Sequence, residues 1–424
     1  MQITLYPSLT SGKLRAIASK SAAHRLLICA AFADKPSSIR CEQINEDIIA
    51  TVNCLCALGA SITRVGEIYN VTPIKNVNKS AILPCNESGS TLRFMIPICA
   101  ALNGSFTFEM KGRLPSRPLS PLKEVLEQNG VSISAPTADT LLVSGELLGN
   151  YFEIAGNVSS QFITGLLFSL AILKRKATLK ITTKIESEPY IALTLDALSA
   201  FGIDIIKNEN EFTVFGNRSL TAPSELCVEG DWSNAAFPLA LGILGKNPIS
   251  VDGLLPSSKQ GDKKIIELLE AFGGKIEQNG SCFTAYPSKL HGIEIDASNI
   301  PDLVPILATV ASVANGKTVI CGAARLRLKE SDRLVAISTT LNALGGDVSE
   351  TDDGLIINGK PYLNGGTVDS FGDHRIAMSA AVASVICQGS LTITRADTVN
   401  KSYPDFWRDI KKLGAIYTEN QPKR

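Results

Sequence analysis

The sequence has no excess of charge of either sign, because its 41 Lys and Arg residues balance its 41 Asp and Glu residues. Proteins that bind nucleic acid or an anionic membrane surface usually carry a strong positive charge, so both partners are disfavoured. Hydrophobic residues make up 45% of the 424 residues and charged residues 19%, which argues against a disordered or coiled-coil protein. Any site for an anion must therefore be local.

Several sequence signatures of metal and cofactor sites are missing as well. The chain has no HExxH sequence, no P-loop, no dinucleotide fingerprint and no cluster of Cys and His residues. We therefore expect no metal ion and no cofactor to be required.

The ten cysteines form no CxxC pair and no paired framework. Several lie in apolar stretches, as Cys54, Cys99 and Cys387 do, which is typical of reduced cysteines in the core of a cytosolic protein. The first residues lack a basic segment followed by an apolar one, so we expect no secretory signal. The longest uncharged stretch, 154–173, contains polar residues in its first half, and only its second half is apolar enough for a buried helix. These features predict a soluble, cytoplasmic protein.

One pattern recurs six times: the apolar end of a helix, a glycine, and an alternating segment typical of a strand. The glycines are Gly59, Gly130, Gly202, Gly273, Gly345 and Gly414, at intervals of 71, 72, 71, 72 and 69 residues. Glycine suits the residue after a helix because the backbone there usually enters the left-handed region. The sequence thus predicts six α/β repeats, each with two helices and several strands.

A second set of residues recurs at the same period and marks the starts of helices. These are N-cap types followed by segments rich in Ala, Leu and Ile: Ser21, Ser90, Ser160, Asp231, Asp302 and Asp373. Since serine gives way to aspartate after the third, we predict two similar lobes of three repeats each. The first lobe comprises residues 19–228 and the second comprises residues 1–18 plus 229–424, with ligands bound in a cleft between them.

The start of a helix attracts anions because its first backbone N–H groups are unpaired and its dipole is positive there. Basic residues accompany such starts in the first half of the chain, with Lys20 and Arg25 around Ser21, and Arg93 after Ser90. Each serine alone fits an ordinary N-cap. Three serines at equivalent positions, two of them with basic companions, favour a site for a phosphate or carboxylate ligand.

In the second half of the chain the equivalent positions are acidic, and capping is a sufficient explanation for Asp231 and Asp302. Residues 325–333 follow a predicted strand and contain three Arg, one Lys, one Glu and one Asp. Such a segment is often a solvated surface, but its place between a strand and a helix favours function. Arg forks bind phosphate or carboxylate, and a neighbouring Lys and Glu can exchange protons. His374 also lies at a helix start, where the dipole disfavours its protonation.

Nine short motifs between Lys13 and Arg408 form an ordered set. They are Lys20-Ser-Ala-Ala-His-Arg25, Glu87-Ser-Gly-Ser-Thr-Leu-Arg93, Arg117-Pro118, Ser159-Ser-Gln161, Ser187-Glu-Pro-Tyr190, Pro301-Asp302, Lys329-Glu-Ser-Asp-Arg333, Asp373-His-Arg375 and Lys401-Ser-Tyr-Pro404. In this set the chain resembles the family of 5-enolpyruvylshikimate-3-phosphate synthases, which are enolpyruvyl transferases. The resemblance covers all six repeats.

The resemblance implies an α/β fold of two similar lobes, each of three βαβαββ units, around a central cleft. It implies an enzyme that transfers the enolpyruvyl group of phosphoenolpyruvate to the 5-hydroxyl of shikimate 3-phosphate and releases phosphate. This reaction belongs to the shikimate pathway to chorismate and the aromatic amino acids, and it proceeds by addition and elimination through a tetrahedral intermediate. The two small molecules are the expected partners, without nucleic acid or membrane, and we expect a monomer.

The resemblance also assigns binding residues. Those implied for shikimate 3-phosphate are Lys20, Ser21, Arg25, Ser159, Ser160, Gln161, Ser187, Tyr190, Asp302 and Lys329. Those implied for phosphoenolpyruvate are Lys20, Gly89, Arg117, Gln161, Arg333, Arg375 and Lys401. Cationic side chains and helix starts in a closed site suit two anionic substrates, because their mutual repulsion must be offset.

Four residues are assigned to proton transfer and related steps on the same basis. Asp302 is the expected base at the shikimate hydroxyl, and Glu330 exchanges the proton at C3 of phosphoenolpyruvate. Lys20 assists the leaving phosphate, and His374 positions or assists Glu330. Two positions depart from the family pattern, since Glu87 and Arg325 each stand where many members have asparagine, which leaves those two ligand contacts open.

Three alternatives remain at this stage. A sister enzyme transfers enolpyruvyl to UDP-N-acetylglucosamine and carries a catalytic cysteine before its Arg-Pro pair, but the segment 111–118 contains no cysteine. RNA 3′-phosphate cyclases use related repeats, and the zero net charge counts against them. A binding protein with a decayed site is disfavoured by the intact charged set from Lys20 to Lys401, since such groups cost stability when close together.

Overall fold

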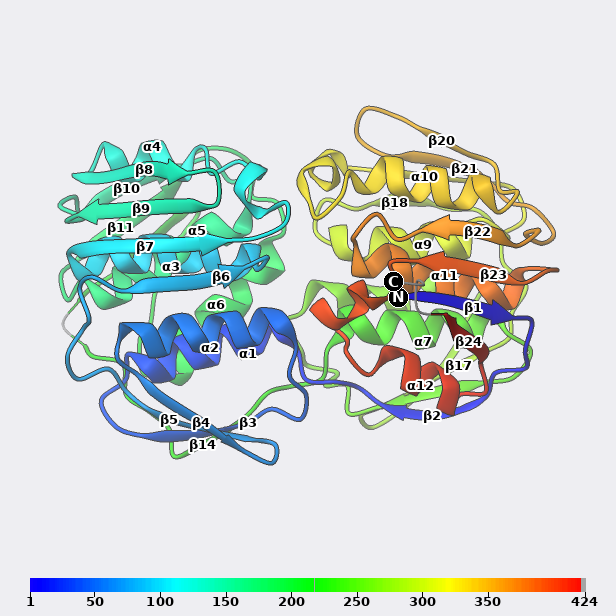
Figure 1. Cartoon of the computed structure of the whole chain (residues 1–424), viewed down its shortest axis with the longest axis horizontal. Coiled ribbons are helices and arrows are strands. Elements are labelled where there is room, and N and C mark those ends of the chain that lie inside the picture. The colour runs from blue at the N-terminus through cyan, green and yellow to red at the C-terminus, as the bar shows by residue number, and fades with distance from the viewer. Residues whose placement is uncertain (217, 421–424) are drawn as a thin grey trace. The chain divides into compact units, whose positions relative to one another are not determined.

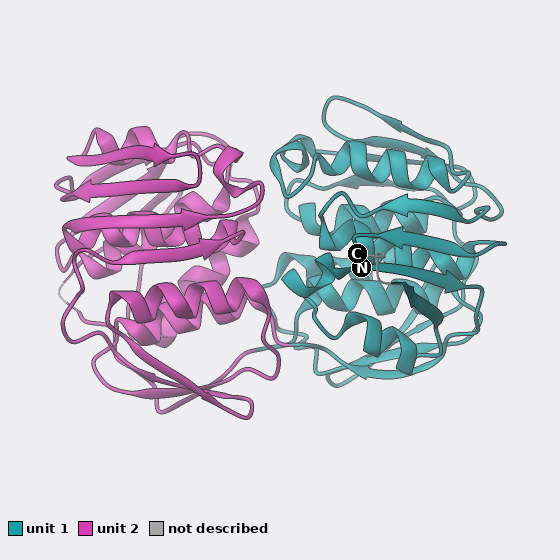
Figure 2. Ribbon diagram, in the orientation of Figure 1, with its two compact units in different colours: residues 1–17, 229–424 teal, residues 18–228 magenta. Residues whose placement is uncertain are grey.

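The structure is a computed structural model that describes residues 1–216 and 218–420. The chain divides into two compact units, which Figure 2 distinguishes. Unit 1 comprises Met1–Ile17 and Glu229–Arg424, and unit 2 comprises Ala18–Val228. Each unit has its own hydrophobic core.

Unit 2 contains three sheets of four strands among the described residues, in the orders β14-β3-β5-β4, β6-β7-β9-β8 and β10-β11-β13-β12. Their bounds are β3 Ser37–Arg40, β4 Ser61–Val65, β5 Ile68–Thr72, β6 Ile82–Asn86, β7 Gly104–Met110, β8 Val131–Thr137, β9 Thr140–Gly145, β10 Tyr151–Ile154, β11 Ala177–Ile181, β12 Ile206–Asn208, β13 Glu211–Val214 and β14 Glu225–Cys227. The helices are α1 Lys20–Ala31, α2 Glu46–Leu58, α3 Gly89–Leu102, α4 Leu122–Glu127, α5 Ser160–Ile172 and α6 Glu188–Ala200, with a 3-10 turn η1 at Leu114–Ser116.

Unit 1 likewise contains three described sheets, in the orders β22-β23-β1-β24, β16-β17-β15-β2 and β18-β19-β21-β20. Their bounds are β1 Gln2–Tyr6, β2 Gly12–Arg15, β15 Ile249–Asp252, β16 Lys275–Asn279, β17 Cys282–Tyr286, β18 Glu294–Asp296, β19 Lys317–Cys321, β20 Val348–Glu350, β21 Leu355–Asn358, β22 Gly366–Asp369, β23 Leu391–Thr394 and β24 Ile416–Asn420. The helices are α7 Trp232–Leu244, α8 Ile265–Ala271, α9 Val304–Ala311, α10 Arg333–Ala343, α11 His374–Ala383 and α12 Phe406–Lys412, with 3-10 turns η2 Gly261–Lys264, η3 Pro301–Leu303, η4 Ala324–Leu328, η5 Ser384–Ile386 and η6 Ala396–Lys401.

All six sheets of the described residues share one pairing scheme, and Figure 1 labels every strand of the sheet β6-β7-β9-β8. One edge strand runs parallel to its neighbour, and the two remaining pairings are antiparallel. The N-terminal strands serve unit 1, since β1 pairs with β23 and β24, and β2 runs parallel to β15. In unit 2 the corresponding edge is filled by β14, which runs parallel to β3. The mixed α/β class and the repeated arrangement agree with the sequence-based prediction.

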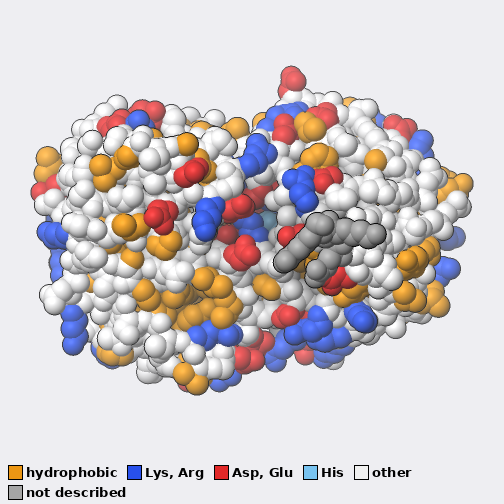
Figure 3. Space-filling model, in the orientation of Figure 1, with side chains coloured by type: hydrophobic (Ala, Val, Ile, Leu, Met, Phe, Trp, Pro, Cys, Tyr) orange, Lys and Arg blue, Asp and Glu red, His pale blue; other side chains and the backbone are white. Residues whose placement is uncertain are grey.

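Helices form the interior of each unit. In unit 1, α7, α9 and α11 pack against one another, and every residue of α11 is buried. In unit 2, α3 packs against α5 and α2, while α1 packs against α2 and α6. On the face drawn in Figure 3, Lys and Arg side chains are interspersed with Asp and Glu, as expected from the balanced composition. No helix in the described part of the chain is long and apolar enough to cross a membrane.

The six glycines predicted to follow helices all have a positive φ angle, which confirms that reading. The angles are 116° at Gly59, 91° at Gly130, 78° at Gly202, 98° at Gly273, 89° at Gly345 and 99° at Gly414. At Gly59 the N–H donates to the carbonyls of the last helical turn of α2, so this residue closes the helix before β4 begins.

The predicted helix starts need partial correction. Asp231 and Asp373 are the N-caps of α7 and α11, as predicted. The serines are shifted: the observed N-caps are Ser19, Ser88 and Ser159, so the predicted caps lie one or two residues inside their helices. The reason is local, because a second serine follows each observed cap one or two positions later and fits the same sequence pattern.

The capping role expected for Asp302 is wrong. Asp302 lies within η3, and α9 begins only at Val304, with no side-chain cap hydrogen bond at Leu303. Pro301 favours a tight first turn because it has no N–H group to satisfy. The carboxylate of Asp302 is left to make other contacts.

Gly59 and Gly66 allow a matched test of the glycines. Both have positive φ, 116° and 59°. A Cβ atom at Gly59 would lie 2.7 Å from the backbone oxygen of Asn76, whereas a Cβ at Gly66 would meet nothing within 4 Å. We expect Gly66→Ala to lower the free energy of unfolding by about 1 kcal/mol and Gly59→Ala by clearly more, roughly 2 kcal/mol or above. Urea denaturation measures both, and equal losses would contradict a steric requirement at Gly59.

Candidate active site

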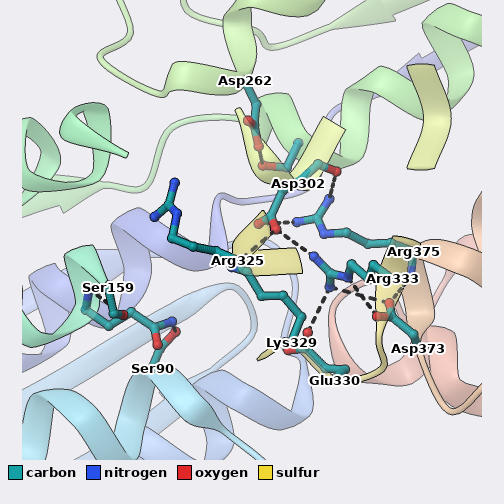
Figure 4. Close-up of polar contacts among 12 residues, drawn as sticks. Ser90, Ser159, Asp262, Asp302, Arg325, Lys329, Glu330, Arg333, Asp373 and Arg375 are labelled. Atoms are coloured by element: carbon teal, nitrogen blue, oxygen red, sulfur yellow. Dashed lines mark hydrogen bonds and ion pairs between the residues drawn. The ribbon is translucent and has the colours of Figure 1, made fainter. Parts of the chain in front are cut away.

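In unit 1, two arginines hold the side chain of Asp302 (Figure 4). Arg333 Nη1 donates to Asp302 Oδ1 at 2.9 Å, and Arg375 Nη2 donates to Asp302 Oδ2 at 2.9 Å. Arg375 Nη1 also donates to the backbone carbonyl of Asp302 at 3.2 Å. Lys329 Nζ lies 3.8 Å from Asp302 Oδ1. The carboxylate therefore lies among three cations.

The starts of neighbouring helices bring these groups together. Asp302 lies in η3 just before α9, Arg333 is the first residue of α10, and Arg375 is the second residue of α11. Asp373 caps α11 by accepting a hydrogen bond from the backbone N–H of Arg375 at 2.9 Å. Because the helices belong to successive repeats, residues far apart in sequence meet at one end of the unit.

Arg333 is the centre of this cluster. Its side chain is only 2% exposed, and Nε donates to Asp373 Oδ2 at 2.7 Å while Nη2 donates to Glu330 Oε2 at 2.9 Å. Burial by itself would lower the pKa of the guanidinium, but the charges of Asp373, Glu330 and Asp302 outweigh it and raise the pKa. Arg333 thus stays charged and fixes three carboxylates in place.

The same contacts control the basicity of Asp302. Burial disfavours its charged form, yet the positive charges of Arg375, Lys329 and Arg333 hold the pKa of its carboxyl well below the ordinary value of 3.8. A carboxylate with so low a pKa is a weak proton acceptor. In the arrangement seen, Asp302 is the counterion of the arginines rather than an activated base.

Asp262, in η2, is a buried carboxyl group near this cluster that sequence reasoning missed. It is 1% exposed and accepts a hydrogen bond from the Ser233 hydroxyl. Burial, followed by the negative charge of Asp302, raises the pKa of Asp262 to about 7, although Arg375 acts in the opposite sense. Nothing in the sequence around Asp262 signals this, because the effect comes from burial and from residues distant in the chain.

In unit 2, cationic side chains gather at the start of α3. A Cβ atom on Gly89 would lie 2.6 Å from Arg117 Nη1 and 2.9 Å from Arg93 Nη1, so both guanidinium groups lie against this glycine. Arg93 Nη1 donates to Gln161 Oε1 at 2.9 Å, and Gln161 Nε2 donates to Ser90 Oγ at 3.0 Å. The starts of α3 and α5 therefore meet, and their N–H groups and arginines suit an anion.

Lys20 and Arg25 on α1 have partners within unit 2. Lys20 Nζ donates to Asp47 Oδ2 at 2.9 Å. Arg25 is buried, and burial lowers its pKa to about 10. Its guanidinium donates to the hydroxyl of Thr194 at 2.9 Å and to the backbone oxygens of Ser21 at 2.6 Å and of Tyr190 at 2.8 Å. Arg25 thus joins α1 to α6.

The remaining predicted residues also lie at the ends of elements. Ser21 is the second residue of α1, Ser160 is the first residue of α5, and Ser159 caps α5. Ser187 precedes α6 with a φ angle of 56°, and Tyr190 lies in the first turn. Lys401 is the buried last residue of η6. His374 is 1% exposed, and its Nδ1 lies 3.9 Å from Asp373 Oδ1.

Within each unit, the structure thus brings most of the predicted residues to helix starts. It adds four charged residues that the sequence-based assignment leaves out: Asp47, Arg93, Asp262 and Asp373. Arg93 and Asp373 lie inside recognised motifs and could have been found there, whereas Asp47 is 27 positions from Lys20 with no shared motif. The described residues contain no group of three or more His, Cys, Asp or Glu side chains suited to a metal ion.

The comparison with protein families gives one match over most of the chain. A family model described as EPSP synthase (3-phosphoshikimate 1-carboxyvinyltransferase) matches residues 6–410. The chain is 42% identical over 429 residues to a 3-phosphoshikimate 1-carboxyvinyltransferase of Clostridium novyi, covering 98% of each chain. It is 44% identical over 421 residues to the protein of that name from Clostridium perfringens, covering 98% of this chain and 99% of the relative.

Solved structures share the fold at lower sequence identity. The EPSP synthase of Acinetobacter baumannii superposes with a TM-score of 0.81 at 23% identity, covering 99% of this chain and 100% of the other. An enolpyruvyl transferase of Streptomyces tendae gives a TM-score of 0.80 at 20% identity, covering 98% of both chains. These likenesses support the fold alone.

The raised pKa of Asp262 predicts a pH effect on stability. Between its ordinary value of 3.8 and about 7, the folded protein keeps a proton on Asp262 that the unfolded chain releases, so stability falls as the pH rises through this window. Asp262→Asn removes the titrating group but can still accept from Ser233. We expect the variant to lose less stability between pH 4 and pH 7 than the unsubstituted protein, as measured by urea denaturation.

Asp252→Asn is the matched control in the same unit. The hydrogen bond from Lys13 is the largest of the contacts that lower the pKa of Asp252, to about 2. Both its folded and unfolded forms are therefore ionised above pH 5, and the substitution should shift stability equally at pH 5 and pH 7, which lie within the range tested for Asp262. If the free energy of unfolding of the Asp262→Asn variant and of the unsubstituted protein changed in parallel with pH, a group other than Asp262 would cause the loss of stability.

Proposed function

The chain belongs to the EPSP synthase family, and from this membership we propose how its own residues perform the family's reaction. It is a transferase that moves the enolpyruvyl group of phosphoenolpyruvate to the 5-hydroxyl of shikimate 3-phosphate and releases phosphate. The reaction is a step of the shikimate pathway in aromatic amino acid biosynthesis. The hydroxyl adds to C2 while C3 gains a proton, and the tetrahedral intermediate then loses phosphate and that proton.

We assign the arginines at Asp302 to phosphoenolpyruvate. The observation that supports this most directly is that Arg333 and Arg375 each present an N–H group to a carboxylate oxygen at 2.9 Å, which is the geometry that a substrate carboxylate requires. Lys401 belongs to the same assignment. In unit 2, the arginine pair at Gly89 supports the assignment of Gly89, Arg117 and Gln161 to this substrate, and Arg93 joins them.

Binding then changes the chemistry of Asp302. When the substrate carboxylate accepts hydrogen bonds from Arg333 and Arg375, these cations no longer neutralise Asp302 fully, and the pKa of its carboxyl rises from its depressed value. A higher pKa makes Asp302 a better acceptor for the proton of the attacking hydroxyl. Asp302 thus becomes an effective base only when phosphoenolpyruvate is bound.

The other proton steps keep their sequence-based assignments. Glu330 exchanges the C3 proton, and its carboxylate is held at 2.9 Å by Arg333 Nη2. Lys20 assists the departing phosphate, and its ammonium is held by Asp47. His374 positions or assists Glu330 in this assignment, and its Nδ1 lies 3.9 Å from Asp373 Oδ1.

The acceptor substrate is assigned to a larger set of side chains. We propose that shikimate 3-phosphate contacts Lys20, Ser21, Arg25, Ser159, Ser160, Gln161, Ser187, Tyr190, Asp302 and Lys329. Support comes from the hydroxyls and N–H groups at the start of α5, where Ser159 Oγ accepts from the N–H of Gln161 at 3.3 Å. Arg25 already bonds to α6, so we expect it to support Tyr190 as well as to bind the ligand.

We further propose that the chain works in the cytoplasm as a monomer and needs no cofactor. All ten cysteines are free thiols, and even Cys54 and Cys85, whose sulfurs are 3.9 Å apart, form no disulfide. This fits a reducing compartment. Light scattering of the protein used in the assay below should give the mass of one chain, 45.2 kDa.

The decisive assay measures phosphate release from phosphoenolpyruvate with each of two acceptors. We expect release with shikimate 3-phosphate and none with UDP-N-acetylglucosamine. Release only with the sugar nucleotide would overturn the acceptor assignment while leaving the fold intact. Release with neither would mean that the site has lost its activity.

Asp302→Asn tests the proposed base. We expect kcat to fall by about 10²–10⁴-fold because the variant cannot take the proton, whereas KM for phosphoenolpyruvate should not rise, since a competing carboxylate has been removed. Steady-state kinetics measures both constants, and Asp252→Asn, an acid in β15 of the same unit, serves as the control. An unchanged kcat would contradict the assignment, and a raised KM with unchanged kcat would make Asp302 a binding residue only.

A further inference from the structure

A chain of buried polar side chains joins three helices of unit 2. His24 lies on α1, Thr51 on α2 and Thr91 on α3, and each is 0% or 1% exposed. His24 Nδ1 lies 2.7 Å from Thr51 Oγ1, and Thr51 Oγ1 lies 2.7 Å from Thr91 Oγ1. Thr91 Oγ1 also lies 2.7 Å from Ser88 Oγ and donates to the backbone oxygen of Asp47 at 3.4 Å. This hydrogen-bond chain links α1 to α3 through α2.

The direction of the hydrogen bonds follows from counting protons. Each hydroxyl can donate once, and the carbonyl of Asp47 can only accept. If Thr51 donated to His24, the proton of the neutral imidazole would lie on Nε2, which has no hydrogen-bond partner among the residues that the structure describes. A buried N–H without an acceptor is rarer than an unpaired acceptor. The favoured order is therefore His24 Nδ1–H to Thr51, Thr51 to Thr91, and Thr91 to the carbonyl of Asp47, with the Ser88 hydroxyl donating to Thr91 Oγ1.

His24 can fill this role because it stays neutral. Burial, together with the positive charges of Lys20 and Arg25, lowers the pKa of His24 to about 3, and the opposing charge of Asp47 does not restore it. The imidazole also packs edge to face on Phe94, with ring centroids 6.2 Å apart. A protonated imidazole would lose the unpaired Nε2 acceptor and place a charge in an apolar setting.

The hydrogen-bond chain lies next to two residues assigned to phosphoenolpyruvate, Lys20 and Gly89. Asp47 is the junction, since its side chain holds the Lys20 ammonium at 2.9 Å while its backbone oxygen accepts from Thr91. Thr91 is two residues after Gly89, against which the arginine pair lies. A shift between α1, α2 and α3 would therefore move the Lys20 ammonium relative to the Gly89 turn.

We propose that His24 and Thr51 are positioning residues for the phosphoenolpyruvate site, because the one-way hydrogen-bond chain they form fixes Lys20 and the Gly89 turn relative to each other. Neither residue touches the substrate in this account. The inference rests on the proposed assignment of Lys20 and Gly89 to phosphoenolpyruvate. A merely structural role would affect stability without a selective effect on this substrate.

Thr51→Val tests the proposal because valine keeps the shape and removes the hydroxyl. We expect KM for phosphoenolpyruvate to rise about ten-fold at a temperature where circular dichroism shows the variant to be fully folded. KM for shikimate 3-phosphate, which is assigned to Lys20 but not to the Gly89 turn, should rise clearly less. Thr51→Ser keeps the hydroxyl and should restore the original KM. A folded Thr51→Val variant with unchanged KM for phosphoenolpyruvate would overturn the proposal.

Two controls separate the possible failures. Ser169→Ala removes another buried hydroxyl of unit 2, one that bonds to the Leu166 carbonyl of its own helix at 2.7 Å, and should leave both KM values unchanged. Lys20→Met tests the underlying assignment. If Lys20→Met leaves KM for phosphoenolpyruvate unchanged, Lys20 does not bind this substrate. The positioning proposal then fails because its premise is wrong, whatever the geometry of the hydrogen bonds between His24, Thr51 and Thr91.

The unsubstituted protein provides an independent test that needs no variant to fold. The sequence has only three histidines, so selective ¹⁵N-histidine labelling gives a simple spectrum. We expect the His24 resonances to show a neutral ring protonated at Nδ1, with no titration between pH 5 and pH 8. A ring protonated at Nε2 would reverse the direction of the chain, and a titrating ring would contradict its neutral role; either result overturns the proposal.

Discussion

The active cluster of unit 1 depends on one buried cation, the guanidinium of Arg333. A charge removed from water is costly unless its hydrogen-bonding groups are paired, and Arg333 is paired with carboxylates from three different segments. Removal of any one of them would leave an uncompensated charge in the interior. This requirement fixes η3, α10 and the start of α11 relative to one another more tightly than apolar packing, which has no direction, could do.

The repeated architecture explains why such clusters form at all. In each sheet the parallel pair of strands is followed by the same antiparallel pairings, so the helices of successive repeats begin at equivalent places. Their unpaired N–H groups and N-terminal side chains then meet within a unit. In unit 2 Gln161 joins the starts of α5 and α3, and in unit 1 Arg375 of α11 reaches back to Asp302 before α9. Repetition of a simple fold thus concentrates anion-binding groups without any excess of positive charge in the chain.

Within each unit, carboxylates of the protein pair with the cationic groups that we assign to the substrates. Lys20 is matched with Asp47, and the Asp302 carboxylate occupies the donors of two arginines. An anionic substrate can exchange for such a carboxylate, so the arginines need not be stripped of water at the moment of binding. The exchange also links binding to chemistry, since the carboxylate that is displaced is the proposed base. In unit 2, hydrogen bonds through the buried hydroxyls of Thr51 and Thr91 join the helices next to the Lys20–Asp47 pair.

Local features of the fold and site could be read from the sequence, because their causes are local. A glycine after a helix is required by the backbone angle at that residue, and Asp231 and Asp373 cap helices through hydrogen bonds to residues two or three positions away. The period of these signals is enough to predict the α/β class and the repeats. The serine caps were displaced by one or two residues because adjacent serines satisfy the same local rule, and the ligand assignments of the individual residues remain predictions.

What depends on distant residues was decided by the tertiary structure. Asp302 looks like a helix cap in the sequence, but the folded chain places two arginines, 31 and 73 positions away, on its oxygens. The same is true of Asp47 as the partner of Lys20 and of the raised pKa of Asp262, which comes from burial. Sequence patterns report the short-range geometry of the backbone, whereas the strength of an acid or the partner of a charge depends on which groups and how much water surround it after folding.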